Sequence, residues 1–307
     1  MDTKKIMEKA DIAVGNLIAD GGYLNPEQSN RFIIMMMDQP TIIKDVRVVR
    51  MNSPIRKIDK IGFGSRILRA APASGSYLPD ADRSKPDLGQ VTLTTKEVIA
   101  EVHLPYDVLE DNIERGNLNS TIMSLIAERA SVDCEEWILL ADTAIVGDAF
   151  LALGDGALKL AVDHVIDSTA APVGVSKALF KAGIRQLPDK YFRVPSDLRF
   201  YISPAVATEW IDEWADRETA EGDAKMRMGG TSPAYGVPMN PSALMPDDKY
   251  LLTFPKNMIW GIQRQIQVET DKDIRARTYI IVLTMRMDFK FEETDAVVKY
   301  DGINPDA

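Results

Sequence analysis

The sequence predicts an α+β fold, and three stretches of the chain support this class. Residues 117–144 have the apolar spacing of one long helix. Residues 51–105 hold two β-like arms around a polar middle, and residues 276–291 alternate like one long strand. No internal repeat and no linker separates independent domains. We therefore expect one folded unit that combines helical and sheet regions.

The long helix is the element on which the rest of the chain is expected to pack. Asn117 or Asn119 can cap its start, because a short polar side chain there accepts hydrogen bonds from free backbone N–H groups. Apolar residues at steps of three and four form one stripe: Ile122, Ile126, Ala130, Cys134, Trp137 and Ala141. Charged residues lie largely off this stripe: Glu128, Arg129, Asp133, Glu135 and Glu136. At about 1.5 Å per residue, the helix would span roughly 35–40 Å.

The composition is that of an ordinary globular chain that can bury a core. Its 307 residues, 45% hydrophobic and 27% charged, allow one large domain or two small ones. No apolar run reaches the ~18–20 residues of a membrane span. The charged N-terminus lacks the apolar region of a secretory signal. The single cysteine excludes a disulfide framework and a multi-cysteine metal site. Cytosolic synthesis is therefore expected.

The net charge of −10 is unevenly distributed along the chain. Residues 1–105 hold 15 Lys and Arg against 13 Asp and Glu, whereas residues 106–307 hold 21 against 33. Tight nucleic-acid binding depends on clustered Lys and Arg that release counterions from phosphates. The acidic balance therefore excludes this mode of binding for the body of the protein.

The two arms within residues 51–105 predict a hairpin that needs support from outside its own subunit. The first arm extends to residue 72, and residues 73–90 are rich in the Gly, Pro, Ser and Asp of turns. The returning arm alternates between apolar and polar residues as far as Leu104. A long two-stranded hairpin is only marginally stable alone in water. A neighbouring subunit is the expected support.

The remaining segments predict a mixed series of helices, strands and loops. Helices are expected at residues 3–19, 26–38, 106–116, 175–187 and 204–218. Strands are expected at residues 41–51, 198–203, 249–254, 257–262 and 264–270. A small hairpin is expected around residues 154–156, and residues 218–236 lose all periodicity and are expected to form a flexible tip.

Residues that could carry catalysis are few and isolated. His103 ends a β-like arm and His164 lies in the expected small hairpin, and neither has a Ser or Cys motif beside it. Cys134 falls on the apolar stripe of the helix, where a buried small hydrophobe is expected rather than a nucleophile. Residues 61–64, Ile-Gly-Phe-Gly, lack the third glycine and the strand-to-helix context of a dinucleotide loop. A bend in the arm is expected there.

The acidic residues do not form a recognisable metal site. Asp271 and Asp273, like Asp247 and Asp248, offer oxygen ligands, but neither pair completes an EF-hand loop, so solvated turns are expected. The helix from residue 204 combines a core-facing aromatic pair with a wet acidic face: Trp210, Trp214, Asp212, Glu213, Asp216 and Glu218. The sequence therefore predicts no catalytic residue, no cofactor-binding residue and no metal ligand.

The order of these segments resembles the major capsid proteins of tailed double-stranded DNA phages, which have the Hong Kong 97-type fold. Residues 91–143 resemble that family's returning loop strand, short helix and spine helix. The run LRFYISPAVATEWID, residues 198–212, resembles its axial strand and helix, and residues 235–270 and 277–303 resemble its closing strands. The sequence departs from the family's pattern in two places. Asp142-Thr143 stand where the family often has a glycine-rich break after the spine helix, and no long N-terminal segment resembles a scaffolding domain.

The resemblance implies a division of the chain into five regions. They are the N-terminal arm 1–50, the extended β-hairpin loop 51–105, the peripheral domain with the spine helix 106–174, the axial domain 175–275 and the closing strand of the peripheral domain 276–307. The tip at residues 218–236 would lie near the axis of a capsomer.

The resemblance also implies a structural protein without enzymatic activity. It would self-assemble as pentamers and hexamers of an icosahedral shell that encloses a phage genome, in the virion, after assembly in the host cytoplasm. Expected partners are further copies, a portal, a separate scaffolding protein and, as a further option, a decoration protein; the DNA would be enclosed without sequence-specific binding. No membrane partner is expected.

Five arm residues are candidates for the assembly interface: Arg66, Arg69, Tyr77, Arg83 and Lys85. Arg66 and Arg69 are three apart, so in a strand they would project from opposite faces. Four lysines are open candidates for a covalent cross-link: Lys57, Lys60, Lys85 and Lys96. Two alternatives remain open, an encapsulin-type bacterial nanocompartment shell and, from another class, a metal-assisted hydrolase that uses the Asp-rich turns.

Overall fold

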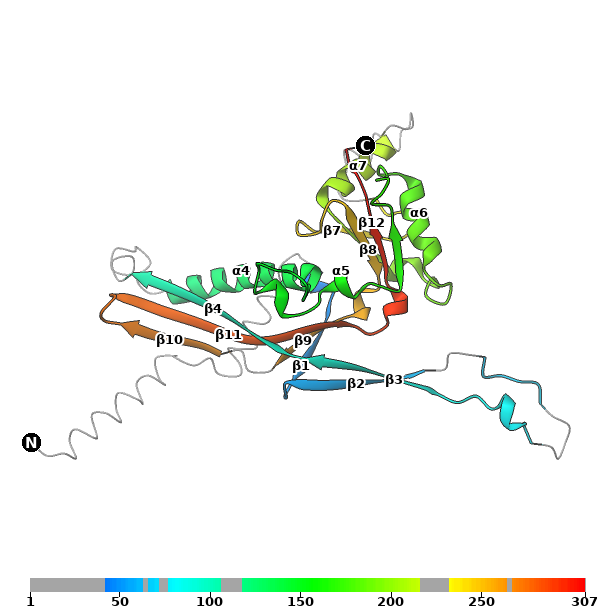
Figure 1. Ribbon diagram of the computed structural model, residues 1–307, viewed down its shortest axis with the longest axis horizontal. Helices are drawn as coiled ribbons and strands as arrows, with labels where there is room; N and C mark the ends of the chain where they lie inside the picture. The colour runs from blue at the N-terminus through cyan, green and yellow to red at the C-terminus, as the bar shows by residue number, and fades with distance from the viewer. Residues whose placement is uncertain are drawn as a thin grey trace, which may run out of the picture.

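The computed structural model describes residues 42–62, 66–71, 77–105, 118–215, 232–263 and 267–306. The expected helices at residues 3–19, 26–38 and 106–116 and most of the 218–236 tip lie outside these ranges. The described part consists of two five-stranded sheets, each with its own helices, and a two-stranded hairpin that projects from the base of the first sheet (Figure 1). The predicted α+β class is confirmed.

The first sheet has the strand order β1-β9-β11-β10, and β4 also pairs with β11. The strands are β1 (Arg47–Met51), β4 (Lys96–Pro105), β9 (Met258–Gln263), β10 (Gln267–Asp273) and β11 (Thr278–Phe291). β11 is the predicted long closing strand. β4 pairs with its first ten residues, and on the other side β10 and β9 follow one another along its length.

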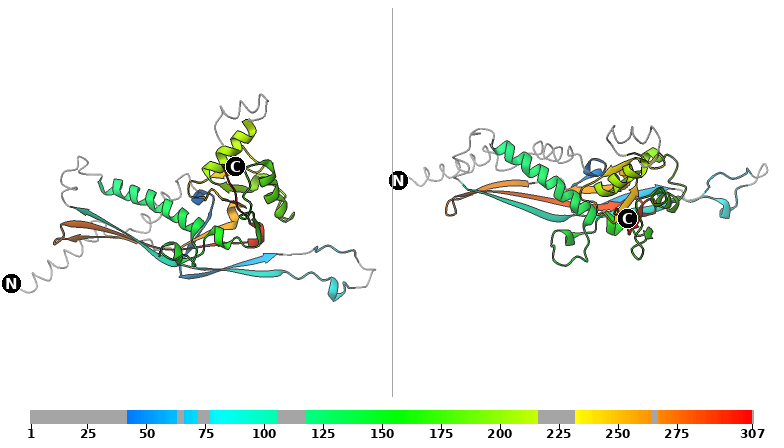
Figure 2. Two further views of the ribbon diagram at one scale, coloured as in Figure 1. Left: turned by 45° about the horizontal axis from the view of Figure 1, so that its top comes forward. Right: turned by 90° about the horizontal axis from the view of Figure 1, so that it is seen from above.

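One face of this sheet is covered by the long helix α4 (Leu118–Leu140), which crosses it obliquely (Figures 1 and 2). Trp137 and Cys134 of the predicted stripe are buried against alternate residues of β11: Ile281, Leu283, Met285 and Met287. Because side chains alternate along a strand, the intervening residues of β11 point to the opposite face of the sheet.

One charged residue of the helix departs from the predicted pattern. Glu135 was expected off the apolar stripe, yet it is only 3% exposed and accepts a 2.7 Å hydrogen bond from Ser242 Oγ. The C-terminal half of α4 is buried on more than one side, because the segment that follows β7 packs on it as well as the first sheet.

The second sheet has the order β5-β12-β8-β6-β7. Its strands are β5 (His164–Asp167), β6 (Arg199–Ile202), β7 (Met239–Pro241), β8 (Lys249–Thr253) and β12 (Val298–Asp301). The helices α6 (Lys177–Gln186) and α7 (Pro204–Ala215) pack on it and complete a second core, which is rich in aromatic rings: Phe180, Phe200, Trp210, Tyr250 and Tyr300.

The segment that joins α4 to β5 differs from the predicted small hairpin. It forms the short helices η3 (Leu151–Leu153) and α5 (Ala157–Leu160). Gly156 donates a 2.7 Å hydrogen bond from its backbone N–H to the carbonyl of Ala141, and a Cβ on Gly156 would lie 2.9 Å from the Trp137 carbonyl oxygen. The glycines therefore allow the chain to pack closely against the end of α4 rather than to turn between two strands.

The strand pairing also differs from the predicted regional boundaries. β9 and β10 both fall within the predicted axial region, 175–275, yet both pair in the first sheet with β11. β12 was assigned to the closing strand of the peripheral region, yet it pairs with β5 and β8 in the second sheet. The reason is that pairing joins segments far apart in sequence, so contiguous ranges do not describe either sheet.

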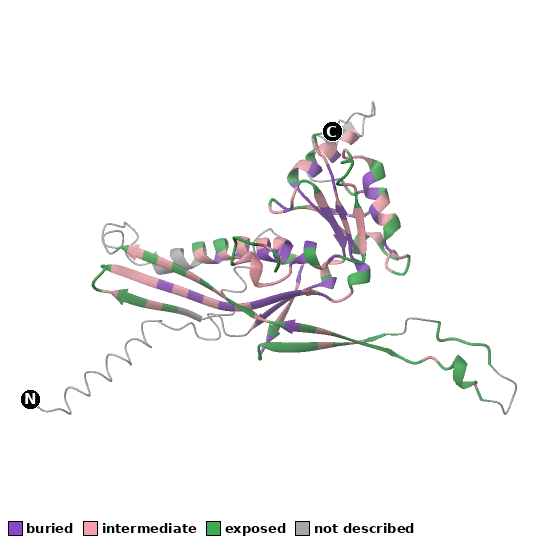
Figure 3. Ribbon diagram, viewed as in Figure 1, coloured by how far each residue is buried: buried purple, intermediate pink, exposed green. Residues whose placement is uncertain are grey.

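The projecting hairpin consists of β2 (Ile55–Gly62) and β3 (Asp87–Thr94), which pair along their full length. The returning arm was expected to continue in the hairpin to Leu104, but it divides at Thr95, and β4 leaves the hairpin to join the first sheet. Most of the hairpin is exposed, as are most of the described residues beyond it, 66–71 and 77–86 (Figure 3). The remaining short helices are η1 (Ile42–Lys44), η2 (Asp80–Asp82), η4 (Pro195–Asp197), η5 (Pro255–Asn257) and η6 (Thr294–Ala296).

Candidate assembly interface

The base of the hairpin is anchored by a small apolar core. Met51, Leu93 and Ile259 are fully buried against one another, and Ile58 packs beside them. Gly261 of β9 allows this contact, since a Cβ there would lie 2.9 Å from Met51 Sδ and 3.1 Å from a methyl group of Leu93. The hairpin therefore leaves the first sheet from a fixed position.

Asp288 holds the point where the hairpin separates from the sheet. Its Oδ2 accepts a 2.6 Å hydrogen bond from the backbone N–H of Thr94, and its Oδ1 accepts one of 2.9 Å from its neighbour Phe289. Burial raises the pKa of this carboxyl above its ordinary value, and the N–H donors and nearby Lys290 oppose that shift. A second tie joins Lys60 Nζ to the carbonyl of Glu292 and, at 3.1 Å, to the Glu293 carboxylate.

The two faces of the hairpin differ in burial because of this anchoring. Ile58 and Leu93 belong to the face that packs on the sheet. The opposite face carries Ile61 and Leu88, which are direct cross-strand partners and are 73% and 77% exposed. Cross-strand apolar pairs stabilise a sheet when they are covered. No described element of the chain covers this pair, so it is a surface that a partner can bury.

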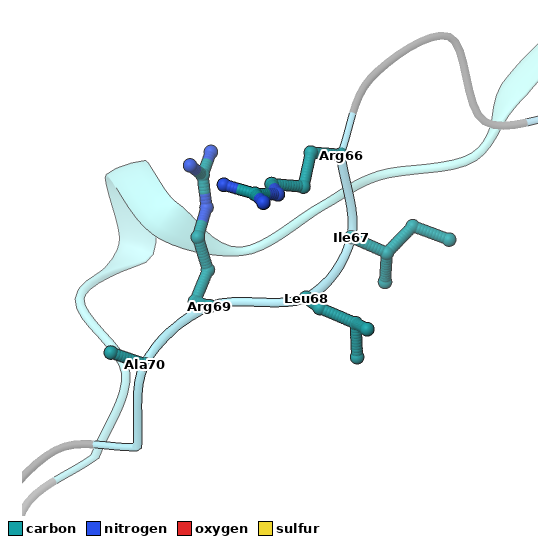
Figure 4. A pocket seen from close by; sticks show the side chains of 5 residues that line it. All are labelled: Arg66, Ile67, Leu68, Arg69 and Ala70. Carbon is teal, nitrogen blue, oxygen red and sulfur yellow. The ribbon is translucent and has the colours of Figure 1, made fainter.

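Beyond the hairpin, residues 66–71 follow an extended path without strand pairing. Arg66 and Arg69 were expected on opposite faces of a strand, but their guanidinium groups lie together on one side of the segment, and Ile67 and Leu68 point to the other (Figure 4). Together with Ala70 these residues line an open concavity of about 570 Å³. The irregular backbone explains the difference, because the alternation of side chains holds only in a strand.

Neither arginine forms an ion pair with another of the described residues. Two like charges side by side that form no ion pair with a described residue repel each other, and a carboxylate from outside the chain would relieve that repulsion. Leu68 is 84% exposed beside them. The segment thus presents both charge and apolar surface.

The other predicted interface residues fall into two groups. Tyr77 is 89% exposed, and Lys85 is also exposed. Arg83 instead bonds within its own loop, to the Asp80 carboxylate and, at 3.1 Å, to the carbonyl of Leu78. The structure therefore brings Arg66 and Arg69 together and leaves Arg83 in a local contact.

Sequence reasoning missed the exposed apolar residues of the arm. Ile61, Leu88, Ile67 and Leu68 were not among the candidates, although β2 and β3 carry apolar residues on both faces. A free hairpin that packs on one side needs apolar residues on one face only. The presence of apolar residues on both faces of β2 and β3 was therefore the sequence signal that could have identified these four residues as interface candidates.

The residues considered as catalytic or metal-binding candidates are either buried in the core or bonded to neighbouring residues of the chain. Cys134 is buried, and burial raises the pKa of its thiol to about 12. His103 Nε2 lies 2.6 Å from the Glu101 carboxylate on the exposed surface of β4. The carboxylates of Asp271 and Asp273 accept hydrogen bonds from nearby backbone N–H groups. Within the described ranges, no three His, Cys, Asp or Glu side chains are grouped as metal ligands require. Among the described helices, none is long and apolar enough to cross a membrane.

Comparison with solved structures defines the class of protein. The chain of a satellite phage P4 procapsid that includes the size determination (Sid) protein matches with a TM-score of 0.69 at 14% identity, over 96% of this chain and 98% of that one. The capsid of an empty GTA particle matches with a TM-score of 0.61 at 12% identity, over 86% and 90%. The holo-SrpI encapsulin complex of Synechococcus elongatus PCC 7942 matches with 0.53 at 13%, over 88% and 90%. The fold is the Hong Kong 97-type capsid fold.

A curated relative narrows this class to one family. YqbE of Bacillus subtilis (strain 168), which is named as a candidate prophage capsid protein, is 45% identical over 311 aligned positions that cover 97% of this chain and 98% of the relative. No model of a known protein family matches the sequence. The chain belongs to the tailed-phage major capsid proteins, and it is a structural protein of the capsid shell.

Proposed function

We propose that the protein assembles as pentamers and hexamers that close into an icosahedral shell around double-stranded DNA. The observation that carries this proposal is the β2–β3 hairpin, which leaves the body with the Ile61–Leu88 pair uncovered by any described element. In the proposed shell, an adjacent subunit buries this pair. The interface then includes Arg66, Arg69, Tyr77 and Lys85, whereas Arg83 serves the shape of its own loop.

The proposal assigns each sheet to a part of the capsid subunit. The first sheet with α4 is the peripheral domain and the second sheet with α6 and α7 is the axial domain. The hairpin with residues 63–86 is the extended loop. The axial domain would approach the capsomer axis through the tip at residues 218–236, and residues 1–50 would contribute the N-terminal arm.

The charge distribution supports the role of a container. Residues 106–307 hold 33 acidic against 21 basic residues. A basic inner wall would bind packed DNA through counterion release, whereas an acidic wall lets it move during packaging. We propose that the protein carries no enzymatic activity, assembles in the host cytoplasm, and works with a portal, a separate scaffolding protein and optionally a decoration protein.

Microscopy of the purified chain tests shell formation. Closed shells, or rings of five and six subunits, are expected, and a population of small particles only would contradict the proposal. The contents of particles from the native host after prophage induction test whether the shell encloses double-stranded DNA. Nuclease-protected double-stranded DNA is expected, whereas an enclosed enzyme without DNA would favour the encapsulin-type shell.

A further inference from the structure

The β2–β3 hairpin is held to the body of the protein at its base and again further along its length. At the base, Leu93 is buried in the small apolar core and the Thr94 amide binds Asp288. The further contact is made by Lys60, whose cross-strand partner is Gly89. At about 3.3 Å per residue, this contact lies roughly 13 Å along the hairpin from Leu93. A hairpin held at one point can pivot, whereas one held at two points has a fixed direction.

The local sequence allows the Lys60 side chain to reach the body from within the hairpin. Lys60 follows Ile58 by two residues, so both side chains lie on the face of β2 that packs on the sheet. A Cβ at Gly89, directly opposite, would lie 3.2 Å from Lys60 Cε. The lack of a side chain at Gly89 therefore leaves a passage for the lysine stem. The Lys60 side chain is 24% exposed, so it is largely shielded along this path.

Lys60 binds the segment that leads from the first sheet to the second. Its Nζ donates to the carbonyl oxygen of Glu292 and, at 3.1 Å, to the carboxylate of Glu293. These two residues follow the end of β11 and precede η6 and β12. Hydrogen bonds from an ammonium group are stronger than those between neutral groups. The arm, residues 55–94, is therefore fastened to this connecting segment through one charged side chain.

The connecting segment is itself fastened to both sheets. The backbone N–H groups of Glu292 and Glu293 donate to the carbonyl and to the side-chain oxygen of Asn257, at 2.9 and 2.7 Å. Asn257 Nδ2 donates in turn to Thr253 Oγ1 of β8 at 3.1 Å. Arg47 of β1 forms an ion pair of 2.9 Å with the Glu292 carboxylate. The further contact of the arm therefore lies at the point where the two sheets are joined.

We propose that Lys60 is a latch that holds the arm of the free subunit in one direction relative to both sheets, ready for a partner. This inference rests on the proposed shell assembly and concerns the subunit before it assembles. Binding costs less when the binding surface is already ordered, because fewer conformations are lost on association. The latch is polar and partly exposed, so it is weakened by salt and can be released, unlike the buried contact of Leu93.

Hydrogen exchange of the Thr94 amide in the free subunit tests the latch. This amide donates to Asp288 while the base of the arm is seated, so its exchange rate reports how often the arm opens. Lys60→Met keeps a long side chain but removes the ammonium group, and it should speed the exchange about fivefold. Lys57→Met is the matched control, because Lys57 is exposed on the same strand and forms no ion pair with a described residue.

Two further measurements separate the latch from a general loss of stability. Added salt should speed the exchange of Thr94 in the unmodified protein and have a smaller effect in Lys60→Met, where the ion pair is already gone. Gly89→Val fills the passage but keeps Lys60 and Glu293, and valine favours a strand. It should speed the exchange as much as Lys60→Met does, and the two changes combined should add little, since both open the same contact.

The consequence for assembly is measured on the same variants by light scattering. Lys60→Met should raise the subunit concentration needed for shell formation about fivefold, because the arm must then be ordered during association. Lys57→Met should leave this concentration unchanged.

Several results would overturn the latch. They are equal exchange of Thr94 in Lys60→Met and Lys57→Met, an equal response to salt with and without Lys60, unchanged exchange in Gly89→Val, and normal assembly of Lys60→Met. Faster exchange throughout both sheets of Lys60→Met would also overturn it, because the contact would then stabilise the whole fold rather than direct the arm. Failure of the unmodified protein to form shells would instead contradict the proposed function, and the exchange rates of the free subunit distinguish the two failures.

Discussion

Trp137 is the side chain on which the end of α4 depends. It is fully buried, and a Cβ on Gly154 would lie 2.5 Å from its ring, so the loop after the helix is shaped around the indole. Removing so large a side chain leaves a cavity that its surroundings fill only partly.

Trp137→Ala is therefore expected to lower the free energy of unfolding by about 3–5 kcal/mol. Denaturant unfolding of the free subunit measures it. Leu125→Ala on the same helix is the control, because Leu125 is 58% exposed and its truncation should change stability by less than about 0.5 kcal/mol. Equal losses of unfolding free energy in the two variants would show that the Trp137 side chain is not essential to the packing of the first core.

Asp288 makes stability depend on pH in a direction opposite to most carboxylates. Its pKa is raised on folding, so the folded protein binds this proton more tightly than the unfolded chain does. The resulting stabilisation is fully present below the ordinary pKa of 3.8 and is lost as the pH rises through the raised value.

Asp288→Asn removes this titration while keeping the size of the side chain. The unmodified protein should gain stability relative to Asp288→Asn as the pH is lowered from neutral through the raised pKa. Paired unfolding curves at several pH values measure the difference between the two proteins. A difference that stays constant, or that shifts the other way, would show that burial does not dominate at this carboxyl.

At the scale of elements, the hairpin combines a rigid base with an uncovered far end. Leu93 is buried at the base, while Ile61 and Leu88 are exposed on the opposite face. Covering an Ile or Leu side chain contributes about 1.5–3 kcal/mol when the whole side chain leaves water. That gain is available only in an assembly.

Ile61→Ser with Leu88→Ser is therefore expected to weaken assembly and to leave the melting temperature of the free subunit unchanged. Light scattering during assembly and thermal melting of the dissociated protein measure the two properties. Val146→Ser is a suitable comparison, since Val146 is 98% exposed and lies outside the arm. Unchanged assembly in the double variant would remove the pair from the interface.

Local patterns predicted the elements better than they predicted the pairing between them. The apolar spacing of α4 reflects the stripe that packs on the first sheet, and the alternation of β11 reflects its face toward α4, so both elements were expected from the sequence. The division of the returning arm at Thr95 was not expected, because β3 and β4 continue one alternating pattern although they pair with different strands. The gathering of Arg66 and Arg69 depends on an irregular backbone that carries no periodic signal.

At the scale of the whole molecule, polar contacts join the two cores. Ser242, after β7, donates to the buried Glu135 of α4 at 2.7 Å. Asp45 Oδ2 accepts hydrogen bonds from Asn240 at 2.9 Å and from Tyr201 at 3.3 Å. Tyr201 and Leu251 of the second sheet also belong to the first core. The two sheets are therefore held at a defined angle.

Ser242→Ala should lower the free energy of unfolding by about 1–3 kcal/mol, because it leaves a buried carboxylate without this donor. Calorimetry of the free subunit measures the effect, and a separate early transition of the second sheet would be a further sign of weaker coupling. Ser53→Ala, which removes an exposed hydroxyl, is the control. A Ser242→Ala protein as stable as the control would show that Glu135 does not depend on this contact.

The burial of Cys134 has a practical consequence for chemical labelling. It is the chain's single cysteine, and a thiol with a pKa of about 12 inside a core stays protonated and does not react with maleimides at neutral pH. A cysteine placed at Tyr77 would thus be the sole reactive thiol of each subunit. Its rate of modification, compared between free subunits and particles, would report how far the arm is covered, without altering any charge of the protein.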